Sequence, residues 1–324
     1  MRRPRQRYRS GQTNARGLGG LIGGRFKIVL VALVGLAVYW FSNQQTVPFS
    51  GRNQLITVSI DDASQLGEQS YVQILQGEPG GVLCETSRCS PAEAEIVDKV
   101  RTIGRNLQRA SVQLENELLD QGYRFEPVSE KFNWQYNVVP SEQPNAFCLP
   151  GGYVAVYTQI MDVAGDNDGV FEPDDDLRDL DMLAVIMGHE IGHALAHHGA
   201  ERMSQQKIAQ LGQMAVGLGL GDMGVAQQRA VMGAFGFAAS GGLNKFSRDH
   251  ETEADKIGLD LLVRACYDPR EAPELWERMG ELSGGQAPPE WMSTHPASET
   301  RADNFRRWMP DAIAEYEANC GGRF

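Results

Sequence analysis

The pentapeptide His189-Glu-Ile-Gly-His193 is the feature that most constrains this chain. It lies in residues 181–202, where apolar side chains recur at helical spacing, so we expect a helix with one buried face there. Histidines at positions i and i+4 share a helix face, and together they can bind one Zn²⁺ ion. Glu190 lies about 100° around the helix from His189, which directs it to the open side of the metal. We therefore predict one zinc ion per chain, with Glu190 as the general base that accepts a proton from zinc-activated water.

A catalytic zinc needs a third protein ligand and keeps a fourth position open. Residues 247–255, Ser-Arg-Asp-His-Glu-Thr-Glu-Ala-Asp, open a second stretch of helical periodicity and carry Glu251 and Asp255 four positions apart. One carboxylate of such a pair can bind the metal while the other orients a histidine ligand through a hydrogen bond. The residues alone do not separate Glu251 from Glu253 as the ligand.

Two more histidines, His197 and His198, follow the pentapeptide closely. A helix does not easily place three ligands of this spacing around one ion, so we expect capping or supporting contacts from them instead of coordination. The longer pattern HExxHxxGxxH is absent, because Ala196 stands at its glycine and Gly199 at its last histidine.

The N-terminus combines a basic tail with an apolar stretch. Residues 1–27 contain arginine and lysine but no acid, and the uncharged run IVLVALVGLAVYWF follows them. This run is short for a spanning helix, which needs about 20 residues. The basic flank and the aromatic pair Tyr39-Trp40 nevertheless favour an uncleaved signal anchor over residues 28–47, ahead of a cleaved signal or a buried core helix. The positive-inside rule then leaves residues 1–27 in the cytoplasm as a basic tail.

The charge of the whole chain bears on its partners and its location. Asp and Glu number 42 against 30 Lys and Arg, a formal net charge of -12, which argues against nucleic acid as a partner. We expect a single-pass protein of the bacterial inner membrane whose acidic body faces the periplasm. An arginine-rich, acid-free start is also typical of mitochondrial targeting, so the alternatives are a mitochondrial inner membrane or a periplasmic form with a cleaved signal.

The remaining organisation can be predicted from local patterns. Residues 48–89 are polar and interrupted by glycine and proline, and we interpret them as a linker or pro-domain-like segment before the main domain, residues 90–324. Ser-Pro-Ala-Glu followed by apolar spacing predicts a helix over residues 90–121. Alternating patterns predict strands near 132–138 and 153–157. The expected fold is α+β, with a helix-dominated zincin-like domain, a small β-sheet and one N-terminal transmembrane helix.

Five cysteines are compatible with export. Cys84 and Cys89 flank a short polar stretch and are expected to form a small disulfide loop, while Cys266 and Cys320 are a possible second pair. Cys148 is then the odd thiol, in an apolar run. The alternative is five reduced thiols.

Two segments carry weaker patterns. The acidic loop of residues 165–181 has alternating acids, but it lacks the first ligand and the final glutamate of a calcium loop, so a solvated loop is expected. Residues 213–242 are rich in glycine and methionine, and charged residues such as Asp222 and Arg229 prevent them from spanning a membrane. A mobile flap over the cleft, a patch resting on lipid and a buried helical hairpin all fit this segment.

Four motifs together resemble the HtpX-like, CAAX-prenyl-endopeptidase and Oma-type family of zinc metallopeptidases (gluzincins), across roughly residues 90–310. They are HEIGHALAHHGAER from His189, SRDHETEADKIGLDLL from Ser247, NAFCLPGGYVAVYT from Asn145 and STHPASETR from Ser293. The resemblance implies that Glu251 is the third zinc ligand and that Asp255 supports the site without binding the metal.

The resemblance also gives roles to the last two motifs. The third implies a strand beside the cleft, which would bind substrate backbone by strand addition. Its expected substrate-binding residues are Asn145, Ala146, Phe147, Gly151 and Gly152. The fourth implies that His295 lies close to the zinc and can gate it, and either His295 or Arg301 would stabilise the oxyanion.

We therefore expect a membrane-anchored zinc endopeptidase that hydrolyses peptide bonds of misfolded or mis-assembled envelope proteins, as the bacterial quality-control members of the family do. One alternative is a chaperone-like or adaptor module with a self-blocked zinc site. Glu190 argues against it, because a structural zinc site has no use for a base. The other alternative is a metal-dependent hydrolase of a non-peptide bond, which a lipid-binding pocket in residues 213–242 would favour.

Overall fold

The computed structural model describes residues 19–85, 89–165, 177–219, 247–282, 294–295 and 299–321. These ranges contain the helix-dominated α+β fold that the sequence predicts. The chain divides into two compact units. Asn43–Lys207 and Ala238–Phe324 form the larger unit, which holds the predicted site, and Met1–Ser42 with Ile208–Phe237 form the smaller one.

The smaller unit contains helix α1 (Gly19–Ser42), which includes the apolar run of the predicted anchor. The exposed bulky side chains of α1 are Leu30, Val31, Leu33, Val34, Val38 and Phe41. The helix ends at Ser42 and strand β1 (Gln44–Thr46) follows, so the segment predicted over residues 28–47 is not helical to its end. Within the described ranges, no helix has both the length and the apolar character that crossing a bilayer requires.

A three-stranded sheet lies in the larger unit. Strands β3 (Gln135–Val139), β4 (Ala146–Leu149) and β5 (Tyr153–Tyr157) follow the order β3-β5-β4, with β5 parallel to β3 and antiparallel to β4. The two predicted strands are thus confirmed as β3 and β5. Gly151 and Gly152, with φ of 94° and 86°, make the turn between β4 and β5, where a side chain would be strained.

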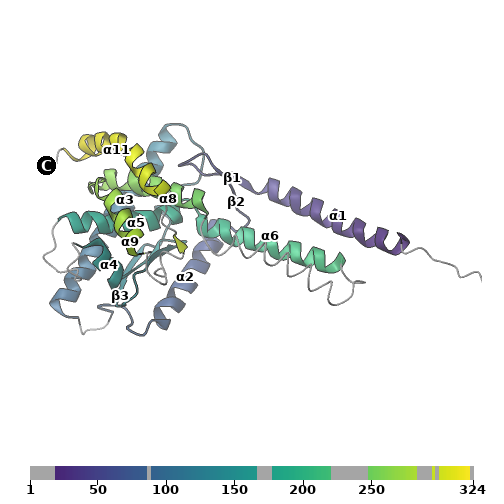
Figure 1. The fold of residues 1–324 in the computed structure, drawn as a ribbon, viewed down its shortest axis with the longest axis horizontal. Coiled ribbons are helices and arrows are strands. Elements are labelled where there is room, and N and C mark those ends of the chain that lie inside the picture. Colours follow the sequence, from purple (N-terminus) through teal and green to yellow (C-terminus); the bar gives the residue numbers. More distant parts are fainter. Residues whose placement is uncertain are drawn as a thin grey trace, which may run out of the picture. The chain divides into compact units, whose positions relative to one another are not determined.

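The sheet is covered on both faces, because successive side chains of a strand point to opposite sides. Val154 and Val156 belong to the main core with helices α3 and α5, whose bounds follow below. Tyr153 and Tyr157 belong to a second cluster with Tyr71 of helix α2 (Ile60–Gly77). Figure 1 shows α2 on the opposite side of the sheet from α5.

Between residues 48 and 85 the chain contains regular secondary structure that the predicted linker did not include. Strand β2 (Asn53–Leu55) pairs with β1, and α2 is an 18-residue helix capped by Ser59. Tyr71 is only 2% exposed, and its hydroxyl donates a hydrogen bond to the carbonyl of Val154 at 2.6 Å. Most glycines and prolines of this segment lie outside these elements or at their ends, but Gly67 is buried inside α2, and this composition suggested a linker.

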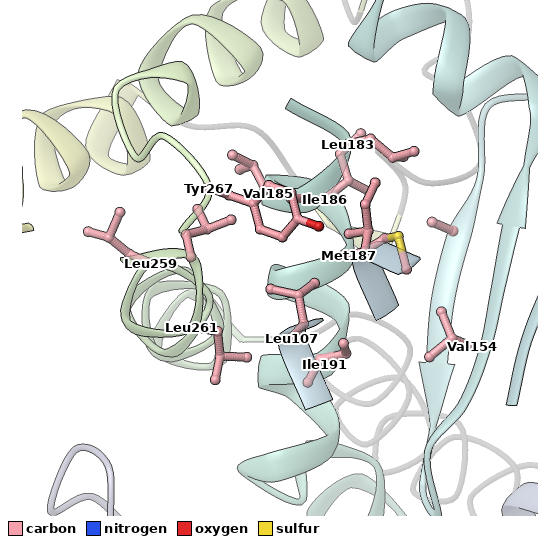
Figure 2. Packing of buried hydrophobic residues seen from close by; sticks show 14 of the residues in the cluster. Leu107, Val154, Leu183, Val185, Ile186, Met187, Ile191, Leu259, Leu261 and Tyr267 are labelled. Carbon is pink, nitrogen blue, oxygen red and sulfur yellow. The ribbon is translucent and has the colours of Figure 1, made fainter. Parts of the chain in front are cut away.

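Three helices form the centre of the larger unit. Helix α3 (Pro91–Asp120) begins where the Ser-Pro-Ala-Glu pattern predicts, with a capping box formed by Ser90 and Glu93, and it packs against α5 (Leu177–Leu195) and α8 (Arg248–Ala265). Figure 2 shows Ile186 and Ile191 of α5 between Val154 of the sheet and Leu259 of α8. This packing brings the two predicted metal-binding helices side by side.

The remaining described helices are α4 (Thr158–Ala164), α6 (His198–Gly219), α9 (Glu271–Leu282) and α11 (Glu299–Cys320). Both expected disulfides are present, Cys84–Cys89 and Cys266–Cys320, and Cys148 is a free thiol. The central part of the acidic loop, residues 166–176, and most of the 213–242 segment lie outside the described residues.

Candidate metal centre

Four buried side chains converge where α5 and α8 meet. They are His189 and His193 of α5, Glu251 of α8, and His295 from the short segment before α11. Nε2 of His189 lies 3.1 Å from Nε2 of His193 and 3.3 Å from Nδ1 of His295. Oε1 of Glu251 lies 3.1 Å from Nδ1 of His295 and 3.5 Å from Nε2 of His193. The four donor atoms are therefore the corners of one small polyhedron.

The dimensions of this polyhedron fit zinc. Ligand atoms about 2.0–2.1 Å from a tetrahedral ion lie about 3.3–3.4 Å from one another. The distances of 3.1, 3.3 and 3.5 Å between donor atoms bracket that value. Three imidazoles and a carboxylate are also a donor set that Zn²⁺ accepts. The structure thus brings together the three predicted ligands, His189, His193 and Glu251, and adds His295 as a fourth.

Glu190 lies beside this cluster but is not one of its four members. It is 3% exposed, and its Oε1 lies 3.7 Å from Nε2 of His295. A carboxylate at this place can accept a proton from water near the metal, as predicted for the general base.

Asp255 and Arg301 support the cluster from behind. Oδ1 of Asp255 lies 2.9 Å from Nδ1 of His189, an arrangement that fixes the orientation of the histidine ring. Arg301, on α11, donates hydrogen bonds to Asp255 at 2.6 and 2.8 Å and to Glu251 at 2.8 Å. Its guanidinium lies 3.4 Å from the ring centre of Trp276. Through these contacts Arg301 can hold the two carboxylates in place, and its part in oxyanion binding stays a prediction.

Burial and pairing shift the ionisation of these groups in opposite directions. Burial raises the pKa of Glu251, but hydrogen bonds from three histidines outweigh burial, and the pKa is lowered overall. The pKa of Asp255 is lowered in the same way, chiefly by Arg301 against burial. Burial and Arg301 lower the pKa of His189, while Asp255 and Glu251 outweigh them and raise it to about 9. Burial lowers the pKa of His193 well below its usual range.

The structure separates the remaining acid and histidine candidates. Glu253 lies 2.8 Å from Nε2 of His198 and outside the metal cluster, so only Glu251 fits the ligand position. Nδ1 of His198 lies 2.7 Å from Nδ1 of His193, which is the supporting contact expected of it. His197 has a left-handed backbone with φ of 57° at the end of α5 and does not join the cluster. Sequence reasoning missed Arg52, whose ion pair with Glu253 links residues far apart in the chain.

The predicted substrate strand is an edge strand. Ala146 and Phe147 lie in β4, whose outer side pairs with no other strand among the described residues. Asn145 immediately precedes it and accepts a hydrogen bond from the amide of Tyr157, while Gly151 and Gly152 form the turn that follows.

A cavity of about 120 Å³ lies beside His193. Cys148 and Leu149 of β4 line it together with Phe132 and Ile60. Burial raises the pKa of the Cys148 thiol well above its usual range, so the thiol stays neutral and is a poor metal ligand.

Known proteins share this arrangement of sequence. A family model described as Peptidase family M48 matches residues 111–309. The mitochondrial metalloendopeptidase OMA1 of Saccharomyces cerevisiae is 30% identical over 303 residues, which cover 90% of this chain and 76% of that protein. The metalloendopeptidase OMA1 of Homo sapiens is 26% identical over 296 residues, 87% of this chain and 49% of that protein. The beta-barrel assembly-enhancing protease of Escherichia coli is 30% identical over 183 residues, 55% of this chain and 35% of that protein.

Proposed function

This chain belongs to peptidase family M48 and is a metalloendopeptidase, and on that premise we propose that it is a zinc enzyme whose general base is Glu190. The observation that carries the proposal is the cluster of four donor atoms within 4.8 Å of one another, with the buried carboxyl group of Glu190 beside it and outside the four. His189, His193 and Glu251 would hold the metal, which would polarise the scissile carbonyl and make water more acidic when bound.

The protein's own groups then perform the proton transfers. Glu190 accepts a proton from the attacking water and delivers it to the leaving amine. Asp255 keeps His189 in the tautomer that presents Nε2 to the metal, and Arg301 holds Asp255 and Glu251 in place through its hydrogen bonds.

His295 occupies the corner that a catalytic zinc leaves open. We propose that this arrangement is a latent form, and that hydrolysis requires His295 to move away so that water and substrate can enter. The same observation favours the second candidate function, a chaperone-like or adaptor module whose zinc site stays closed. The two differ in whether Glu190 is needed.

The deciding experiment uses the purified full chain in detergent, beside its Glu190→Gln and His295→Ala variants. Each is incubated with unfolded casein, and its zinc content is measured by elemental analysis. We expect one zinc in all three, cleavage that falls about 10²–10⁴-fold in Glu190→Gln, and faster cleavage in His295→Ala. Zinc in all three with no cleavage in any would establish the adaptor function instead, and absence of zinc from all three would refute both.

We further propose that substrates bind as extended backbone along β4. An edge strand can pair with any unfolded chain, which suits misfolded or mis-assembled envelope proteins. The cavity beside His193 would accept an apolar side chain next to the scissile bond. This can be tested by letting the wild type and the Cys148→Phe variant cleave a peptide library. Filling the cavity should shift the cleavage preference to peptides with smaller side chains next to the scissile bond. An unchanged preference would exclude the cavity as a subsite.

Location is proposed from the N-terminus. The basic tail, the apolar side chains exposed on α1 and the two disulfides support attachment to a bacterial inner membrane with a periplasmic body. The alternative is the mitochondrial inner membrane, and the names of the OMA1 relatives support it as far as the mitochondrion. Extraction of membranes with alkaline carbonate should release the Val34→Asp variant but retain the wild type. Equal release of both would contradict anchoring by α1.

A further inference from the structure

A second cluster of ionisable side chains lies behind the metal centre. It contains His198 and Glu201 at the start of α6, His250 and Glu253 on α8, and Arg52 from the turn between β1 and β2. Four of these side chains are buried, and the side chain of Arg52 is 23% exposed. Buried charges are retained only when they are paired, so the pairing pattern of this cluster shows what it holds in place.

One chain of hydrogen bonds leads from this cluster to the metal centre. Nδ1 of His193 lies 2.7 Å from Nδ1 of His198, and Nε2 of His198 lies 2.8 Å from Oε2 of Glu253. The same carboxylate accepts hydrogen bonds from Nε of Arg52 at 2.9 Å and from the hydroxyl of Ser50.

Only one arrangement of protons satisfies this chain when His193 binds metal through Nε2. A neutral His193 that coordinates through Nε2 carries its proton on Nδ1 and donates it towards His198. His198 therefore accepts at Nδ1 and carries its own proton on Nε2, which it donates to Glu253. An ionised Glu253 can only accept, and Arg52 can only donate, so every group in the chain has the role that it is able to fill.

We propose that His198, Glu253 and Arg52 are positioning residues for His193, so that the affinity of the site for zinc depends on a residue of the N-terminal segment. This proposal rests on the proposed zinc-binding function. Asp255 contacts His189 directly and fixes its ring, whereas Glu253 fixes the ring of His193 through His198. Arg52 lies outside the residues that the family model matches, so this contact comes from a part of the chain that the family model does not cover.

Glu201 provides a matched control. Arg52 forms ion pairs of the same length with Glu201 and Glu253, 2.8 Å each, and both carboxylates are buried. Glu201 also receives a hydrogen bond from a histidine, His250 at 3.0 Å. Glu201 is not part of the series of hydrogen bonds that leads from Arg52 through Glu253 and His198 to His193. Replacing Glu201 by Gln therefore removes a comparable buried ion pair and leaves the positioning of His193 intact.

The test measures metal binding by the full-length Glu253→Gln and Glu201→Gln variants beside the wild type. Gln at position 253 can donate as well as accept, which permits the reversed tautomers in which His193 carries its proton on Nε2 and cannot bind metal there. We expect zinc affinity, measured by competition with a chelator, to fall about 10–100-fold in Glu253→Gln. The absorption spectrum of the cobalt-substituted variant should also shift. Glu201→Gln should keep the wild-type affinity and spectrum even where its thermal midpoint falls.

Equal losses of affinity in the two variants, or an unchanged cobalt spectrum in Glu253→Gln, would overturn the proposal. If Glu253→Gln does not fold, the test uses Arg52→Gln, because Arg52 is partly exposed. This variant should bind zinc more weakly than the wild type and show a shifted cobalt spectrum. Wild-type affinity and spectrum in Arg52→Gln would overturn the proposal. A wild type that binds zinc and cleaves casein while both variants match it would refute the positioning chain alone. A wild type that binds no zinc would refute the proposed function and this proposal together.

Discussion

Gly258 lies where α8 crosses α5, and replacing it by alanine is expected to push apart the two helices that hold the metal ligands. A Cβ atom built at Gly258 would lie 3.0 Å from the carbonyl carbon of Gly188 and 3.0 Å from the backbone nitrogen of His189. Both neighbours are backbone atoms of α5, so no flexible side chain can move out of the way. Gly188 immediately precedes the proposed metal ligand His189, and the second atom belongs to His189 itself.

The magnitude follows from contact distances. Carbon atoms in ordinary contact are about 3.5–4.0 Å apart, so the backbones of α5 and α8 must separate by about 0.5 Å or more. A metal site keeps its ligand distances within about 0.2 Å, and His189 and Glu251 lie on opposite sides of the new gap. We expect a loss of about 1–3 kcal/mol in the free energy of unfolding from overpacking. Zinc affinity should fall by about tenfold or more.

The assay combines urea denaturation in a chelator with zinc titration of the folded protein. Gly280→Ala is the control, because a Cβ at this position in α9 meets nothing within 4 Å. That variant should keep its zinc affinity and match or exceed wild-type stability by about 0.5–1 kcal/mol. If Gly258→Ala bound zinc as tightly as Gly280→Ala, the close crossing of the helices would not be what sets the spacing of the ligands.

Two further outcomes are expected. Tyr71→Phe should lower the free energy of unfolding by about 1–3 kcal/mol, because it removes the buried hydroxyl that donates to the carbonyl of Val154 and accepts from the side chain of Asn137. Tyr123→Phe at an exposed site should not lower it. Equal urea midpoints for the two variants would refute this. Burial raises the pKa of Glu201, but hydrogen bonds from His250 and Arg52 outweigh it, so its folded pKa lies below its unfolded value. The stability that Glu201 contributes is therefore complete at pH values above its unfolded pKa and is lost as the pH falls through its folded pKa. The Glu201→Gln variant should lose less stability than the wild type between about pH 6 and pH 3. Parallel curves for the two proteins would contradict this.

Local patterns predicted the elements whose signals are local. The capping box at Ser90, the alternation that leads to β5 and the histidine spacing of α5 each depend on residues within a few positions of one another. The acid pair Glu251 and Asp255 was found in the same way, because residues four positions apart lie on the same face of a helix. Their separate roles were implied only by resemblance, and the structure supports these roles by the distances to His189 and His193.

Contacts between distant parts of the chain were beyond such rules. Arg52 reaches Glu253 across 201 positions, and nothing in its neighbourhood marks it as different from any exposed arginine. Helix α2 was hidden because its few apolar residues, such as Tyr71, are buried by a sheet whose position the sequence does not reveal. His295 was associated with the zinc only by resemblance, because a histidine before a proline has no local signal of its own.

The charges buried in the metal centre explain why the site needs an ion. Glu190, Glu251 and Asp255 are three buried carboxyl groups, and Arg301 is the one permanently charged cation that contacts Glu251 and Asp255 among the described residues. Such an imbalance is costly away from water. A Zn²⁺ ion, as proposed, would add two positive charges beside these carboxyl groups. Without it, the carboxylates raise the pKa of His189 to about 9, so a proton on that ring provides part of the charge. Zinc bound at the proposed site would therefore displace this proton.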